Sequence, residues 1–272
     1  MKTYRKRHLI CEKMPFVAMI LTMLITTFAI AMFSSSSGKA SGYLIESAAC
    51  LVLIWIFKLW FAPDYNGSFK PGVTIKELLL ICLPYVIRII LDSVYTGVVN
   101  DWFFKPTFIS FCMAVSAGIV EESMFRAFTL PIGMRYVKSE KRAYMVVAII
   151  SLIFGLSHLA NLSSGNPAMI IVQTFTTFFE SIFFCGLYLR SGGIIPTMIL
   201  HGVYDWTCFV LDPTLENGIP VAEIDAGIIF SILFALSMGI VGLYLIRPSM
   251  QERILKLWNE KWNVHDGGDG ET

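Results

Sequence analysis

The hexapeptide EESMFR at residues 121–126 places three charged side chains inside a stretch that is otherwise apolar enough to span a membrane. A charge in the hydrocarbon region is costly, so it persists where it faces a partner, a water-filled cavity or a substrate. Glu122 and Arg126 are four residues apart and share a helix face, whereas Glu121 points about 100° away from Glu122. Arg126 can therefore hold one carboxylate while the other faces a cavity, and the motif is a candidate active site.

Two of the four histidines, His158 and His201, also fall in predicted spans. Each has a neighbour at helical spacing, because Phe154 precedes His158 by four residues and Asp205 follows His201 by four. His201 and Asp205 lie near the middle of their span, at a depth where they could meet the acidic pair. Counted from the start of its own span, His158 falls toward the outer side. We expect it to converge with the others nonetheless, which requires a later start for its helix or a longer helix before it.

These residues belong to a chain that is 56% hydrophobic and 15% charged, with a mean hydropathy of +0.67, the composition of an integral membrane protein. About 20 apolar residues cross a bilayer. The sequence predicts an all-α polytopic fold with about eight transmembrane helices, at Pro15–Phe33, Tyr43–Phe61, Leu78–Val99, Thr107–Leu130, Ala143–Ala160, Ala168–Leu189, Gly193–Leu211 and Ile224–Ile246.

The distribution of Lys and Arg predicts that both termini are cytoplasmic. With that orientation only Lys39 and Lys105 fall in outer loops, and the outer loop from Asp212 to Glu223 has acids and no base. We interpret the first span as a retained anchor, although Ser34–Ser37 and Gly38 resemble a signal cleavage region. We expect a multi-pass protein of the cell membrane, with a bacterial cytoplasmic membrane favoured.

The domain organisation that follows has four parts. Residues 1–14 form a cytoplasmic segment, 15–106 three transmembrane helices, 107–211 the core with the charged motifs, and 212–272 the last transmembrane helix, an interfacial helix and a tail. The interfacial helix is expected from Pro248 to Trp262. Ile254, Leu255, Leu257, Trp258 and Trp262 would share one side of it, with Arg253, Lys256 and Lys261 available to anionic headgroups.

Three motifs in order, E-E-x-x-x-R, F-x-x-x-H and H-x-x-x-[N/D], resemble the CPBP family of intramembrane proteases, which includes CAAX prenyl endopeptidases and bacterial Abi proteins. The segment 186–196 before His201 is similar to the family's as well, and the likeness covers about residues 107–211. The resemblance implies a CAAX-protease-like helical bundle around an intramembrane site that opens to the cytosolic side. The implied activity is endoproteolysis of a peptide or protein substrate.

The resemblance also implies roles. Glu121 and His158 would activate a water as general base, and Glu122 would help position it or pair with Arg126. His201 and Asp205 would stabilise the oxyanion, with Arg126 and Phe154 as support. Many family members have Asn in place of Asp205, so this residue must be protonated, orient His201 or bind a metal. Glu121, His158 and His201 are an acceptable zinc set, and a metal-free mechanism is equally compatible with the sequence.

Other interpretations stay open at this point. Glu122–Arg126 and Arg88–Asp92 can be simple intrahelical ion pairs, and Glu180 has no obvious partner in sequence. The chain could be a non-catalytic membrane binding protein with a bacteriocin-immunity or scaffold role, or a small transporter, although it shows no two-fold internal repeat. The expected partners are membrane lipids and a peptide or membrane-associated protein substrate, and no nucleic acid. The six cysteines show no CxxC pair, and the oligomeric state is left open.

Overall fold

The computed structural model describes residues 9–32, 39–163, 166–212 and 226–263, and within them all regular structure is helical. The loop after Asp212, the tail from Asp266 and the first eight residues lie outside this part. Helices occupy all eight predicted positions: α3 (Pro15–Ala31), α4 (Ala40–Ile56), α5 (Ile75–Val99), α6 (Phe108–Glu122), α8 (Arg142–Ser157), α9 (Pro167–Ser191), α10 (Ile195–Leu211) and α11 (Ala226–Leu245).

Six of the helical segments in the described residues are long and apolar enough to cross a membrane, and α3 and α10 have 17 residues each. Short elements complete the set: α2 (Leu9–Lys13), the π-helical turn η1 (Phe57–Phe61) that continues α4, and α12 (Pro248–Lys261) after the last span. The predicted all-α, multi-pass membrane fold is confirmed.

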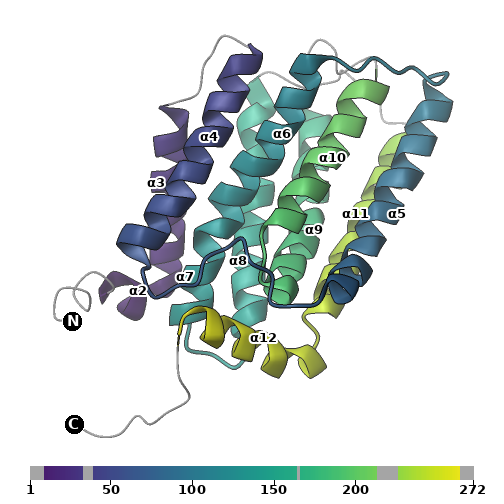
Figure 1. Cartoon of the computed structure of the whole chain (residues 1–272). Coiled ribbons are helices and arrows are strands. Elements are labelled where there is room, and N and C mark those ends of the chain that lie inside the picture. The colour runs from purple at the N-terminus through teal and green to yellow at the C-terminus, as the bar shows by residue number, and fades with distance from the viewer. Residues whose placement is uncertain (1–8, 33–38, 164–165, 213–225, 264–272) are drawn as a thin grey trace, which may run out of the picture.

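The spans form two rows (Figure 1). One row runs α4, α6, α10, α5, and the other contains α8, α9 and α11, with α3 beside α4 and α7 (Thr129–Tyr136). Polar caps start two helices that carry the site. The Thr107 hydroxyl accepts from the backbone N–H of Ser110 at the start of α6, and the Asn166 side chain accepts from that of Ala168 at the start of α9. The motifs lie on helices from both rows, α6 and α10 in one row and α8 in the other.

The helix that begins with α6 is longer than predicted. A π-helical turn, η2 (Ser123–Ala127), follows Glu122 without a break, and α7 continues to Tyr136 instead of ending near Leu130. Helix α8 starts at Arg142, close to the predicted Ala143, and passes into a 3-10 turn, η3 (His158–Ser163). Glu121 therefore lies about as far before the α7–α8 turn as His158 lies after it, which brings both residues to one depth.

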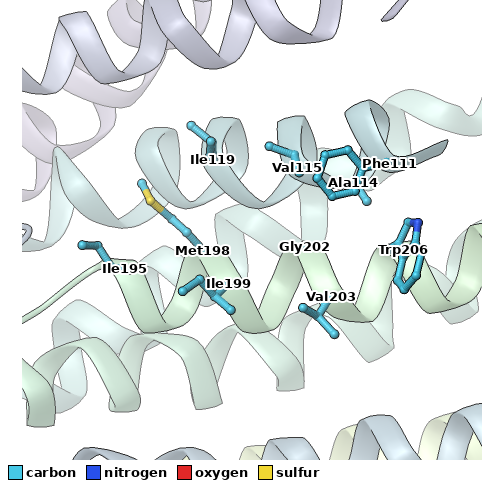
Figure 2. Close-up of a pocket in the computed structure, with 10 residues that line it drawn as sticks. All are labelled: Phe111, Ala114, Val115, Ile119, Ile195, Met198, Ile199, Gly202, Val203 and Trp206. Atoms are coloured by element: carbon cyan, nitrogen blue, oxygen red, sulfur yellow. The ribbon is translucent and has the colours of Figure 1, made fainter. Parts of the chain in front are cut away.

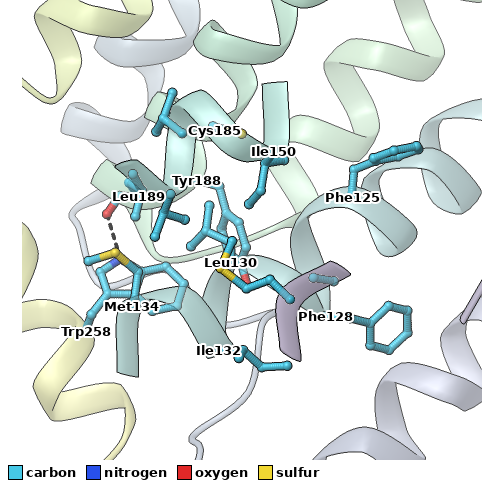
Figure 3. Close-up of a cluster of buried hydrophobic side chains, with 14 of the residues drawn as sticks. Phe125, Phe128, Leu130, Ile132, Met134, Ile150, Cys185, Tyr188, Leu189 and Trp258 are labelled. Atoms are coloured by element: carbon cyan, nitrogen blue, oxygen red, sulfur yellow. Dashed lines mark hydrogen bonds between the residues drawn. The ribbon is translucent and has the colours of Figure 1, made fainter. Parts of the chain in front are cut away.

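Helix α12 lies across one end of the bundle and closes it (Figure 1). The Trp258 indole donates to the Leu189 carbonyl at 3.0 Å, and the Trp262 indole donates to the Pro131 carbonyl at 3.1 Å. Figure 3 shows Trp258 against Leu189, Tyr188 and Met134 in the main hydrophobic core. The predicted interfacial helix exists, but its apolar side packs on the protein's own bundle and not on lipid.

Lys261 corrects one detail of that prediction, because its ammonium is not available to headgroups. The side chain is 6% exposed, and its Nζ donates to the carbonyls of Gly67 at 3.0 Å and Lys70 at 2.9 Å. Burial, together with the nearby charges of Lys70 and Lys58, lowers the pKa of Lys261 to about 8. Lys261 therefore fastens the segment before α5 to the end of α12.

We predict that the stability supplied by Lys261 rises with pH between about 8 and 10.5. In that window the unfolded chain holds the lysine proton and the native protein does not, so unfolding takes up a proton and becomes less favourable. The neutral amine still has two N–H groups for its two carbonyls. The difference in Tm between the wild type and Lys261→Met, measured in detergent, should therefore increase across the window. The increase should correspond to roughly 1–3 kcal/mol in the free energy of unfolding. A constant difference would contradict the prediction.

Candidate functional site

A fully buried carboxylate, Glu122, lies at the centre of the site. Its Oε1 accepts from Arg126 Nη1 at 2.8 Å and from His201 Nδ1 at 2.9 Å, and both Glu122 and Arg126 are 0% exposed. A carboxylate paired with a guanidinium only accepts hydrogen bonds, so Nδ1 of His201 carries a proton. The other ring nitrogen, Nε2, is left for the cavity, which Glu122 itself does not line.

Arg126 ties the acidic pair to two further helices. Its Nη2 donates to the Ser181 hydroxyl on α9 at 2.6 Å, and its guanidinium lies 4.4 Å from the centroid of the Phe154 ring on α8. A guanidinium over an aromatic face is stabilised by the ring quadrupole, more so away from water. Phe154 therefore has a physical reason for its place in the motif, since it covers the buried cation.

The π-helical turn η2 comes directly after the acidic pair. Two hydroxyl groups in or next to it donate to carbonyls four residues earlier, that of Ser123 to Ile119 at 2.5 Å and that of Thr129 to Phe125. Such back-bonding and π-turns locally distort a helix, and π-turns are frequent at functional sites. The local widening sets the direction of Arg126 relative to Glu122, a detail that the predicted regular helix did not contain.

His201 faces two more carboxylates through Nε2. Glu121 Oε2 lies 3.7 Å away and Asp205 Oδ2 3.6 Å away, with side chains 31% and 22% exposed respectively. The imidazole stacks on Phe184 of α9, with ring centroids 5.4 Å apart and an interplanar angle of 17°. Sequence reasoning missed Phe184, because it is one of many aromatic residues in the spans and belongs to none of the motifs.

His158 reaches the same cavity from the end of α8. Its Nδ1 lies 2.9 Å from the Phe154 carbonyl and 3.5 Å from the Thr177 hydroxyl. Because a carbonyl only accepts, Nδ1 carries the proton, and Nε2 is the ring nitrogen left to face the cavity. The Phe154 ring contacts both imidazoles edge-on, with centroids 5.0 Å from His158 and 6.3 Å from His201.

A cavity of about 530 Å³ between the two rows collects these groups. Its lining includes the candidate catalytic residues Glu121, His158, His201 and Asp205. Next to them lie two more polar side chains, Glu180 and Tyr204, and the aromatic rings of Phe154 and Phe184. The remaining lining residues come from the N-terminal parts of α6, α9 and α11 and the C-terminal part of α10, so the cavity lies in the half of the bundle away from α12. All the predicted catalytic residues thus line this one cavity except Glu122, which lies behind His201 and is bonded to it.

The side chains do not have the arrangement of a zinc site. Glu121, His158 and His201 are the candidate ligands, yet no three His, Cys, Asp or Glu residues in the described ranges are grouped so that they could hold a metal ion. In addition, Nε2 of His201 faces two carboxylates while Nδ1 bonds to Glu122. This geometry suits an imidazole held by hydrogen bonds.

A second cavity, of about 350 Å³, lies on a different face of α6 and α10 (Figure 2). Its lining includes Phe111, Ile195, Ile199 and Val203, which are 43–57% exposed and carry no ionisable group. Exposed apolar side chains on a transmembrane helix face lipid, so acyl chains can fill this groove. It contains none of the groups that could do chemistry.

A close crossing of α6 and α10 fixes the distance between Glu122 and His201. A Cβ added at Gly118 would lie 2.4 Å from the Met198 carbonyl oxygen and 2.9 Å from the Gly202 nitrogen, and one at Gly202 would lie 3.0 Å from the Ala114 carbonyl oxygen. Small residues let transmembrane backbones approach this closely. The two glycines are therefore part of the machinery that positions the site.

Fold and site together define an all-helical, multi-pass membrane protein with an acid–imidazole centre inside the membrane. Residues 101–207 match the family model for the type II CAAX prenyl endopeptidases, described as Rce1-like. This stretch is thus similar to an Rce1-like domain, which implies a protease, and the resemblance predicted from the three motifs is confirmed. No curated protein and no solved structure matches the chain.

We predict that Gly118→Ala impairs the site without unfolding the protein. The added methyl group must push α10 away from α6, which lengthens the His201–Glu122 hydrogen bond and displaces Nε2. Small displacements of catalytic groups are expensive, so cleavage should fall about 10- to 100-fold per folded molecule. The measurement is substrate cleavage together with Tm in detergent.

Gly186→Ala is the matched control, because its Cβ would lie 2.7 Å from the Gly242 carbonyl oxygen at the α9–α11 crossing. It should lower the Tm to a similar extent with a much smaller effect on cleavage. Equal losses of cleavage in the two variants would mean that general loosening, and not the α6–α10 distance, is responsible.

Proposed function

We propose that this protein is an intramembrane endopeptidase in which Glu121 and His158 activate a water molecule for attack on a peptide bond. The observation that carries the proposal is a cavity lined by three groups. They are the partly exposed carboxylate of Glu121, the imidazole of His158, whose Nδ1 is bonded to a carbonyl, and the imidazole of His201, which is fixed by Glu122. Its substrate is a peptide or a membrane-associated protein.

The first step forms the bond between water oxygen and the carbonyl carbon. The Glu121 carboxylate or His158 Nε2 takes the water proton as that bond forms, and the carbonyl oxygen becomes an oxyanion. The same base then passes the proton to the leaving nitrogen, the oxyanion re-forms the carbonyl as the C–N bond breaks, and a carboxylic acid and an amine leave. No other reactant is needed.

His201 supplies the charge that stabilises the oxyanion. As an imidazolium it donates Nδ1–H to Glu122 and presents Nε2–H to the cavity, and three carboxylates with oxygens 2.9–3.7 Å from its nitrogens favour this charged form. A preorganised donor of this kind contributes a few kcal/mol, about 2.7–4, in well-studied hydrolases. In this proposal Asp205 compensates the imidazolium and does not touch the oxyanion, which accounts for an aspartate at this position.

We predict that Glu121→Gln reduces cleavage about 10²- to 10⁴-fold, because it keeps the shape of the side chain and removes the base. The assay is mass-spectrometric detection of products from membrane-associated peptides, with and without a prenyl group, incubated with detergent-purified protein. Glu46→Gln is the matched control. Glu46 is also a glutamate within a span, but it contacts Ser116 on α6 and does not line the cavity.

The same assay distinguishes the other readings. Full activity in folded Glu121→Gln would contradict water activation by this residue. Peptide binding without cleavage by folded wild type would favour a non-catalytic role. A zinc chelator in a parallel arm tests the metal-dependent alternative, and the hydrogen-bonded arrangement of His201 supports activity that survives the chelator.

Orientation in the membrane belongs to the proposal as well. The basic residues predict that α12 is cytoplasmic, whereas the cavity lies in the opposite half of the bundle. A substrate that comes from the cytosol must therefore pass some depth into the bilayer to reach it.

We predict the outcome of a cysteine-labelling test of this orientation. In a cysteine-free variant in intact bacterial cells, Lys39→Cys should react with a membrane-impermeant maleimide. Lys256→Cys should react only after permeabilisation, since both positions are exposed. The reverse pattern would invert the topology.

A further inference from the structure

A second buried ion pair lies beside the catalytic cavity. Arg88 on α5 bonds to Glu180 on α9, and their side chains are only 1% and 10% exposed. The Tyr85 hydroxyl donates to the other Glu180 oxygen at 3.1 Å. The intrahelical pair with Asp92 that the spacing suggested is therefore replaced by a pair between helices, which gives Glu180 the partner that the sequence could not supply.

Arg88 also contacts the helix that carries His201 and Asp205. Its Nη2 donates to the Tyr204 hydroxyl at 3.1 Å, and its guanidinium lies 4.0 Å from the centroid of the Tyr204 ring. Glu180, Tyr204 and Asp205 line the cavity, whereas Arg88 lies behind them. Arg88 is also outside residues 101–207, the stretch matched by the family model.

Stability alone is a poor explanation for this pair. A buried ion pair contributes little net stability compared with apolar side chains of the same volume, because both ions must leave water. Here Nε and Nη1 of Arg88 have no hydrogen-bond partner among the described residues, although they are buried. Two unused donors on a buried cation add to that desolvation penalty. Intramembrane ionisable groups of this kind by default indicate function.

We propose that Arg88 is a positioning residue for proteolysis, acting by neutralising the Glu180 carboxylate in the cavity wall and by holding Tyr204 next to Asp205. The inference rests on the proposed function. In the proposed reaction an oxyanion forms in this cavity, next to Glu121 and Asp205. If Glu180 were an additional carboxylate without a counter-charge, it would repel the oxyanion strongly in a medium of low dielectric constant. With Arg88 in place, the negative charge of Glu180 is balanced from behind the wall.

The decisive experiment is a double-mutant cycle on cleavage kinetics. Arg88→Met leaves Glu180 unpaired and should lower kcat at least tenfold with KM changed less than threefold. Arg88→Met combined with Glu180→Gln removes the unpaired charge and should restore kcat to within about threefold of wild type. Arg88→Lys, which keeps the charge, should retain most of the activity. Cleavage is normalised to folded protein by Tm and circular dichroism.

Arg190→Met is the matched control. Arg190 forms a partly buried ion pair with Glu77 at 2.5 Å, outside the cavity, and Arg253 still compensates Glu77 when Arg190 is lost. This variant should keep the wild-type kcat. It removes the same side chain from a comparable pair, so it reports what loss of an arginine costs when no cavity charge is exposed.

The pH profile separates positioning from a merely structural role. The charged or titratable groups around Glu180 are Arg88, Asp92, Tyr85, Tyr204, Asp205, His201, Glu121 and His158. In Arg88→Met, ionisation of Glu180 should make kcat fall relative to wild type as pH rises. The double variant, which still has all the other groups, should lose this slope, whereas a purely structural defect would leave the profile unchanged.

Three outcomes overturn the inference. One is wild-type kcat in Arg88→Met, and another is a folded double variant that is as slow as the single one. If Arg88→Met does not fold, an inactive but folded Arg88→Lys with a slow double variant also overturns it. These outcomes differ from failure of the proposed function, in which wild type and all variants cleave nothing in the peptide panel and both proposals fall.

Discussion

A single buried carboxylate oxygen organises the catalytic region. Oε1 of Glu122 accepts from Arg126 on the same helix and from His201 on α10, and Arg126 in turn contacts Ser181 on α9 and Phe154 on α8. A lone ion in this environment would be prohibitively costly, so each partner is needed by the others. The requirement to pair one buried charge therefore fixes four helices relative to one another and sets the direction of His201.

The same requirement explains how the cavity tolerates its acids. Glu121 and Asp205 flank one nitrogen of His201, and Glu180 is balanced by Arg88 from outside the wall. Each of these carboxylates thus has an imidazole or a guanidinium close to it. The difference between the acids lies in access, because Glu122 is sealed off whereas Glu121 is the most exposed of the three that contact His201. A base that meets water must be the accessible one.

The sequence predicted correctly those features that depend on one helix at a time. The eight helices and the (i, i+4) relationships of Glu122 with Arg126 and of His201 with Asp205 follow from apolar length and helical period. Contacts between helices did not follow, because they depend on rotation and depth that one helix does not encode. Phe184 stacked on His201, Glu180 paired with Arg88 and the burial of Lys261 at the end of α12 are of this kind. The π-turn η2 was missed for a different reason, since its residues are ordinary helix formers.

The position of the cavity constrains how a peptide bond can reach Glu121. Trp258 and Trp262 anchor α12 across one end of the bundle, and the cavity occupies the other half, between two rows of helices. The α6–α10 wall is closed at the Gly118–Gly202 crossing, where backbones touch. For the proposed function we therefore expect the substrate to enter past the N-terminal part of α9 and the C-terminal part of α10, which line the cavity. An unfolded, extended segment suits such an entrance better than a helix, because hydrolysis needs an exposed amide and a helix about 10 Å wide would have to unwind first.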